Sequence, residues 1–152
     1  MNKIEGLHIL IDCTLENNSI LVDYNVGLKF FNKIINTLKL NLLMPYILVD
    51  FPEYEKFNGI TPFNQQKIIN NNKFIQTNCF VDFFYSDKNL GGYSLMGIIS
   101  ESHISIHTFP EKNYFSFDLY SCKVFDTQLL IDIFEQELKG CKLKYNVINR
   151  GN

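Results

Sequence analysis

The residues best suited to chemistry lie in one short segment, which begins at Ser100. It reads Ser100-Glu101-Ser102-His103-Ile104-Ser105-Ile106-His107-Thr108-Phe109-Pro110-Glu111, and Cys122 follows twenty residues after Ser102. Hydroxyl, imidazole, carboxylate and thiol groups are thus close together in a chain with only three histidines and four cysteines. Imidazoles and thiols exchange protons near neutral pH, so these residue types suit acid–base and nucleophilic work.

Taken by themselves, the same residues also permit an interpretation without catalysis. If the segment is extended, His103, Ser105 and His107 share one strand face, which could be a polar outer face. Cys122 near a strand end could be a small buried apolar residue, and Glu111 a solvated loop carboxylate. Residue type alone does not decide between these interpretations.

The pattern as a whole resembles a known family. Glu-Ser-His-x-x-x-His-Thr-aromatic-Pro-Glu, followed by a cysteine some ten residues on, is similar to the self-cleavage and active-site segment of the small prokaryotic S-adenosylmethionine decarboxylases. The match is strongest from Gly91 to Cys122, and Gly6 to Asp12 resembles the family's first strand. The resemblance implies self-cleavage between Glu101 and Ser102, which converts the serine into a covalent pyruvoyl cofactor.

The resemblance also implies a role for each of the other motif residues. His107 stands five residues after the serine, at the position of the family's processing base. Ser94 corresponds to a serine that assists processing, and Cys122 to the residue that protonates the substrate's α-carbon after CO2 leaves. Glu111 corresponds to a glutamate that binds the ribose hydroxyls of an adenosyl substrate.

Two features of the segment depart from a simple transfer of the family's site. Strict strand alternation places Ser102 and His107 on opposite faces, so they meet only if the chain bends or the cleavage bond begins the strand. Lys123 follows the cysteine where glycine is typical, which could alter the turn but not the thiol.

The aromatic run 83–85 lies upstream of the motif. One of its residues could stack on the adenine or the sulfonium of the substrate, but the sequence does not single one out.

Composition indicates one domain and excludes several classes of protein. The chain has 152 residues, of which 46% are hydrophobic, so we expect a single decarboxylase domain over 1–152 that is cut into 1–101 and 102–152. A net charge of -2 argues against a nucleic-acid partner. The cysteines form no CxxC pair, so no metal site is expected, and the absence of a long apolar run predicts a cytoplasmic protein without a membrane span.

Hydrophobic periodicity predicts two helices and a set of strands. One helix is expected from Asp23 to about Leu40, and one from Asp126 or Thr127 to the terminator Gly140. Residues 52–78 are expected to form an irregular connection with a short helix near 63–69. Strands are expected at 7–12, 46–49, 79–85, 95–100, 104–108, 114–120 and 142–148. This order predicts an α+β, two-layer sandwich, with helices on one face of a mostly antiparallel sheet.

The functional prediction is a pyruvoyl-dependent decarboxylase of S-adenosylmethionine, which makes the aminopropyl donor for spermidine and other polyamines. The resemblance implies a Schiff base between the substrate amine and the pyruvoyl group, and a homodimer of cleaved protomers. One alternative is a pyruvoyl-dependent arginine or ornithine decarboxylase, which would use the same Ser102, His107 and Cys122. A second alternative, of another class, is a non-processing partner that regulates an active homologue.

Overall fold

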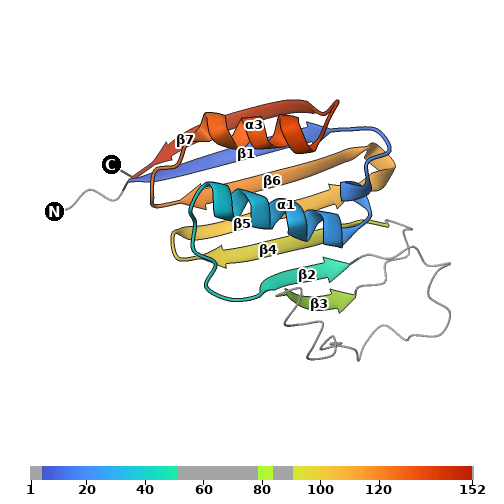
Figure 1. The fold of residues 1–152 in the computed structure, drawn as a ribbon, viewed down its shortest axis with the longest axis horizontal. Helices are drawn as coiled ribbons and strands as arrows, with labels where there is room; N and C mark the ends of the chain where they lie inside the picture. The colour runs from blue at the N-terminus through green and yellow to red at the C-terminus, as the bar shows by residue number, and fades with distance from the viewer. Residues whose placement is uncertain (1–4, 51–78, 84–90, 152) are drawn as a thin grey trace.

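The computed structural model describes residues 5–50, 79–83 and 91–151, which form one sheet covered by helices (Figure 1). The helical elements are η1 (Ser19–Leu21), α1 (Tyr24–Thr37), η3 (Pro110–Lys112) and α3 (Thr127–Glu137). The strands are β1 (Gly6–Thr14), β2 (Tyr46–Asp50), β3 (Cys79–Phe83), β4 (Tyr93–Ile99), β5 (Ser102–Phe109), β6 (Tyr114–Ser121) and β7 (Lys142–Arg150). Within the described residues the strand order is β3-β2-β4-β5-β6-β1-β7. Every neighbouring pair is antiparallel except β2 and β3, which are parallel.

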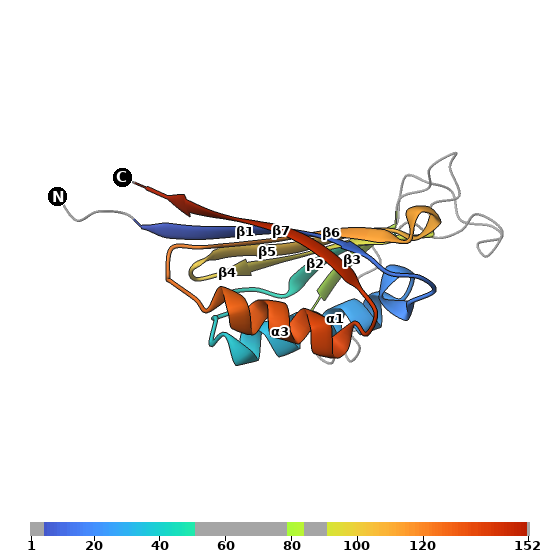
Figure 2. The same cartoon turned by 90° about the horizontal axis from the view of Figure 1, so that it is seen from above.

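The two α-helices lie on the same face of the sheet, and the other face carries no helix in the described part of the chain (Figure 2). The core forms between the helices and the sheet, where Phe117 on β6 packs edge to face against Phe31 of α1 and Phe134 of α3. All three rings are at most 1% exposed. The predicted two-layer α+β sandwich is therefore confirmed. We call the surface opposite the helices the helix-free face.

Both α-helices begin after the aspartates predicted to cap them, whereas α1 ends earlier than predicted. The Asp23 side chain accepts a hydrogen bond from the N–H of Asn25, and Asp126 accepts one from Leu129. Helix α1 ends at Thr37, about one turn before the predicted end at Leu40. The chain leaves the helix because Lys39 adopts a left-handed conformation with φ of 53°.

Strand positions were predicted well, and their ends less so. Strand β5 begins at Ser102 rather than Ile104, and β4 begins at Tyr93 rather than Leu95. These two strands are therefore joined only by Ser100 and Glu101, which form a tight turn. The irregular connection predicted over 52–78, its short helix and the last residues of the strand predicted at 79–85 lie outside the described residues.

A close contact fixes β4 beneath α1. The hydroxyl of Tyr93, which is fully buried, donates a 2.7 Å hydrogen bond to the carbonyl of Ile20. Gly27 lies against this ring, and a Cβ at that position would clash with the Tyr93 hydroxyl. The glycine therefore permits the helix to approach the strand that carries Ser94. No helix in the described ranges is long and apolar enough to cross a membrane.

Candidate active site

The predicted cleavage bond lies at the two-residue turn between β4 and β5. Ile99 pairs with Ser102 across the β4–β5 ladder, so Ser100 and Glu101 alone reverse the chain. Two-residue hairpin loops usually place positive φ angles on their central residues. Here the positive angle falls on Ser102, whose φ is 149°. A side chain is disfavoured in this region, at a cost of about 1–3 kcal/mol, so the backbone is strained at the residue predicted to react.

The carbonyl on the other side of that bond is polarised by a neighbouring strand. The backbone N–H of Cys122, immediately after β6, donates a 2.8 Å hydrogen bond to the carbonyl oxygen of Glu101. Ser121, the preceding residue, pairs with Ser102 in the β5–β6 ladder. The register of β6 therefore places Cys122, an exposed cysteine, beside the predicted scissile bond. An N–H aimed at a carbonyl oxygen also stabilises the negative charge that develops when the carbonyl is attacked.

The side chain of Glu101 is also held in place. Only 8% of the residue is exposed, and Asn41 donates to its carboxylate from both the backbone N–H (3.2 Å) and Nδ2 (3.0 Å). Burial by itself would raise the pKa of this carboxyl. Hydrogen bonds from the Ser100 side chain and from Asn41 outweigh burial, and the pKa is held below its usual range.

A second group of predicted residues lies further along the same hairpin. His107 on β5 pairs with Ser94 on β4, and the His107 Nδ1 lies 2.8 Å from the Ser94 Oγ. Both residues are half-buried on the helix-free face. Glu111 lies beyond the end of β5, in η3, and is exposed.

The structure therefore divides the six predicted residues between the two ends of β5. Ser102 and His107 are five residues apart on one continuous strand, which corresponds to roughly 16 Å along the sheet. Ser102 shares the alternation of Ile104 and Ile106, which pack into the core, whereas His107 lies on the helix-free face. The chain brings Glu101, Ser102 and Cys122 together at one end, and places Ser94, His107 and Glu111 toward the other. Within a single protomer the two groups do not meet.

A cluster on the helix-free face was not found from the sequence. His8 on β1 lies 2.9 Å from the Asp118 carboxylate on β6, through its Nε2 atom. Its ring also contacts the rings of His103 and Tyr120, with centroids 6.3 Å and 5.7 Å away. Arg150 on β7 stacks over the Tyr120 ring at 4.6 Å. His8 is far from His103 and Tyr120 in sequence, and the three residues share one cross-strand row because β1, β6 and β5 are neighbours in the sheet.

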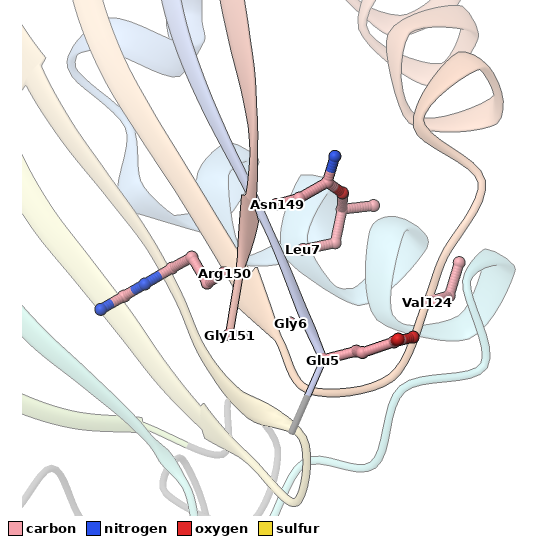
Figure 3. A pocket seen from close by; sticks show the side chains of 7 residues that line it. All are labelled: Glu5, Gly6, Leu7, Val124, Asn149, Arg150 and Gly151. Atoms are coloured by element: carbon pink, nitrogen blue, oxygen red, sulfur yellow. The ribbon is translucent and has the colours of Figure 1, made fainter. Parts of the chain in front are cut away.

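A pocket of about 300 Å³ opens at the edge of the described sheet near the chain ends (Figure 3). Figure 3 shows its lining side chains arranged around the start of β1 and the end of β7. The lining residues are Glu5, Gly6, Leu7, Val124, Asn149, Arg150 and Gly151. None of the six predicted site residues contributes to its lining.

Comparisons with known proteins agree with the motif. Residues 66–151 match the family model described as S-adenosylmethionine decarboxylase. A stretch of 61 residues, 40% of this chain, is 38% identical to an S-adenosylmethionine decarboxylase proenzyme 2 of Bacillus cereus and covers 50% of that protein. A stretch of the same length is 41% identical to the S-adenosylmethionine decarboxylase proenzyme of Clostridium botulinum (strain Langeland) and covers 53% of it. The match thus spans about half the length of these curated relatives.

The fold has a counterpart among solved structures. The crystal structure of the adenosylmethionine decarboxylase from Aquifex aeolicus VF5 superposes with a TM-score of 0.55, covering 99% of this chain and 94% of that one. At 19% identity this likeness concerns the fold alone. The family model, however, covers more than half of the chain, including both ends of β5 and Cys122. This chain therefore belongs to the S-adenosylmethionine decarboxylase family.

Proposed function

We propose that this protein is a self-processing, pyruvoyl-dependent decarboxylase of S-adenosylmethionine, cut between Glu101 and Ser102. The observation that carries the proposal is the geometry of the Glu101–Ser102 peptide bond. Its carbonyl oxygen accepts a 2.8 Å hydrogen bond from the Cys122 N–H, and the residue after it has a strained φ of 149°. A polarised carbonyl and a strained backbone at the serine both favour attack by the adjacent serine hydroxyl.

The proposed self-cleavage needs only water beyond the chain itself. The Ser102 Oγ attacks the Glu101 carbonyl carbon, and the peptide C–N bond is replaced by an ester C–O bond. A base then removes the Ser102 α-proton, the Oγ–Cβ bond breaks, and Glu101 leaves as a carboxylate. The dehydroalanine that remains takes up water and releases ammonia, which leaves a pyruvoyl group on residue 102. No oxidant or reductant is needed.

We propose that His107 is the base of the elimination step and that it acts on the partner protomer. Its imidazole is oriented by Ser94, but it lies roughly 16 Å along β5 from Ser102 of its own chain. A two-fold homodimer that pairs the helix-free faces with opposite β5 directions would place the partner's His107 over the end of β5 at which Ser102 begins the strand. Each of the two equivalent sites would then combine the Ser102 end of β5 from one protomer with the His107 end of β5 from its partner.

The surface of the helix-free face supports this association. Ile47, Met96 and Ile148 lie on it with 38%, 38% and 44% of their surface exposed. The strand register pairs Ile47 with Met96, and Ile148 with the half-buried His8. Exposed apolar side chains spread over one sheet face fit burial against a second copy of the chain.

The remaining predicted residues receive their roles in the same proposal. Once formed, the pyruvoyl group would serve as the electron sink for loss of CO2. Cys122, which is exposed beside residue 102, would deliver the proton that replaces the carboxylate. Glu111 would bind the ribose hydroxyls, and its carboxylate is accessible to them because the residue is exposed in η3.

Intact-mass analysis of the purified protein under denaturing conditions tests the proposal. We expect two chains, 1–101 and 102–152, the second with a pyruvoyl group in place of a free amine. The Ser102→Ala variant should remain one chain. CO2 release should then be measured with S-adenosylmethionine, arginine and ornithine in parallel. A single uncut wild-type chain would contradict the proposal and favour a regulatory partner, and activity on arginine or ornithine alone would contradict the substrate.

A further inference from the structure

We infer that Asn41, in the connection between α1 and β2, is a positioning residue for self-cleavage, and this inference rests on the proposed function. Asn41 makes three hydrogen bonds to the two-residue turn before the scissile bond. Its N–H and Nδ2 donate to the Glu101 carboxylate at 3.2 Å and 3.0 Å. Its carbonyl accepts the Ser100 N–H at 2.8 Å. One residue thus binds both members of the turn, through backbone and side chain.

Together with a hydrogen bond from β6, these bonds hold Glu101 from two sides. On the β6 side, the Cys122 N–H binds the Glu101 carbonyl oxygen at 2.8 Å. On the other side, Asn41 binds the carboxylate of the same residue. A residue whose carbonyl and side chain are both held has little freedom to rotate about its backbone bonds. The face of the carbonyl carbon that Ser102 must attack is therefore fixed before the reaction begins.

The segment that carries Asn41 is anchored independently of the turn. Leu42 forms a β-bridge with Ile99, and the Leu43 N–H donates to the Ile98 carbonyl at 2.9 Å. Lys123, the residue after the exposed cysteine, donates from Nζ to the Lys39 carbonyl at 3.4 Å. The connection is thus bonded both to β4 and to the residues that follow β6. Asn41 therefore binds the turn from a segment whose position is already fixed.

The charge of Glu101 makes the side-chain bond from Asn41 stronger than an ordinary one. The residue is 8% exposed and its carboxyl has a lowered pKa, so the side chain is ionised near neutral pH and is hydrogen-bonded by protein donors. Removing a donor to a buried charge costs more than removing a neutral bond. The loss should appear in cleavage, because the turn can relax from the strained conformation at Ser102 once it is no longer held.

The test follows cleavage over time in a cell-free translation reaction, quenched in denaturant and read by intact mass. Asn41→Asp keeps the size and the backbone N–H but turns the amide donor into a second carboxylate facing Glu101. We expect it to slow cleavage by at least about tenfold. The double variant Asn41→Asp, Glu101→Gln restores a donor–acceptor pair with its direction reversed and should recover most of the rate. Asn36→Asp, at an exposed position of α1, is the matched control and should cleave like the wild type.

Each outcome has a defined meaning. Wild-type cleavage in Asn41→Asp would overturn the role of Asn41 and leave the proposed function intact. An uncut wild-type chain would overturn both. The thermal midpoints of Asn41→Asp and of the double variant are measured in the uncleavable Ser102→Ala background, to separate positioning from folding. If both variants cleave slowly and both melt well below the Ser102→Ala parent, Asn41 has only a structural role and the inference is wrong.

Discussion

The Nδ1 atom of His107 lies 2.8 Å from the Oγ atom of Ser94, directly across the ladder between β4 and β5. In the tautomer whose Nδ1–H donates to the Ser94 Oγ, the opposite ring nitrogen, Nε2, is the one left to accept a proton from another group. The bond also fixes the plane of the ring. Ser94 can thus assist processing by orienting His107, without touching the cleavage bond of its own chain.

The first prediction concerns this bond. Ser94→Ala should slow self-cleavage by about tenfold, since one hydrogen bond orients the ring, and Ser94→Thr should retain most of the rate. Ser116→Ala is the matched control, because Ser116 pairs with His107 from the other side, on β6. Cleavage is followed by intact mass. Equal effects of the Ser94→Ala and Ser116→Ala variants would contradict an orienting role specific to Ser94.

The second prediction tests whether His107 acts across a dimer. Ser102→Ala and His107→Ala should each remain uncut when produced alone. When the two are produced together with different tags, mixed dimers pair an intact Ser102 with the partner's His107. The His107→Ala chain should then be cut in part, and intact mass identifies it by its tag. If that chain stays whole although mixed dimers are isolated, the base does not come from the partner.

The third prediction concerns backbone strain at Ser102. Ser102→Gly and Ser102→Ala both abolish cleavage, so their free energies of unfolding can be compared by urea titration. Glycine accepts a φ of 149° whereas alanine does not, so Ser102→Gly should be more stable by about 1 kcal/mol. The same pair of substitutions at Ser116, inside β6, should show the opposite order in the Ser102→Ala background. A more stable Ser102→Ala would show that the conformation is not strained.

The fourth prediction concerns substrate binding by Glu111. If Glu111 binds the ribose hydroxyls as proposed, Glu111→Gln should weaken that binding, and KM for S-adenosylmethionine should rise by about tenfold or more. Self-cleavage should continue, since Glu111 lies in η3 and not at the turn. Glu135→Gln, on the exposed side of α3, is the control. An unchanged KM in the Glu111→Gln variant would remove Glu111 from the substrate site.

The fifth prediction compares two thiols by their reaction with iodoacetamide. Cys13 is fully buried, and burial raises the pKa of its thiol, so it forms little of the reactive thiolate. Cys122 is exposed and should be alkylated first, with loss of decarboxylase activity. Peptide mapping at pH 8, with and without denaturant, gives the order. Labelling of Cys13 before Cys122 in the folded protein would contradict the burial and the exposure described above.

Much of the local structure follows from the sequence because its causes are local. The caps at Asp23 and Asp126 depend on one side chain and the N–H groups that follow it. The alternation of core residues such as Ile104 and Ile106 depends only on extended backbone. The chemical types at Ser102, His107 and Cys122 were likewise visible in the sequence, because a motif consists of residue identities and spacings.

The arrangement of these groups was decided by tertiary structure. Strand alternation predicted opposite faces for Ser102 and His107 but left open whether a bend brings them together, and the continuous course of β5 keeps them at opposite ends of one strand. The N–H of Cys122 reaches Glu101 only because β6 pairs with β5 in one register. Asn41 reaches the same residue across 60 positions of sequence. Such contacts depend on strand order and register, which are set by packing of the whole sheet and not by any local run of residues.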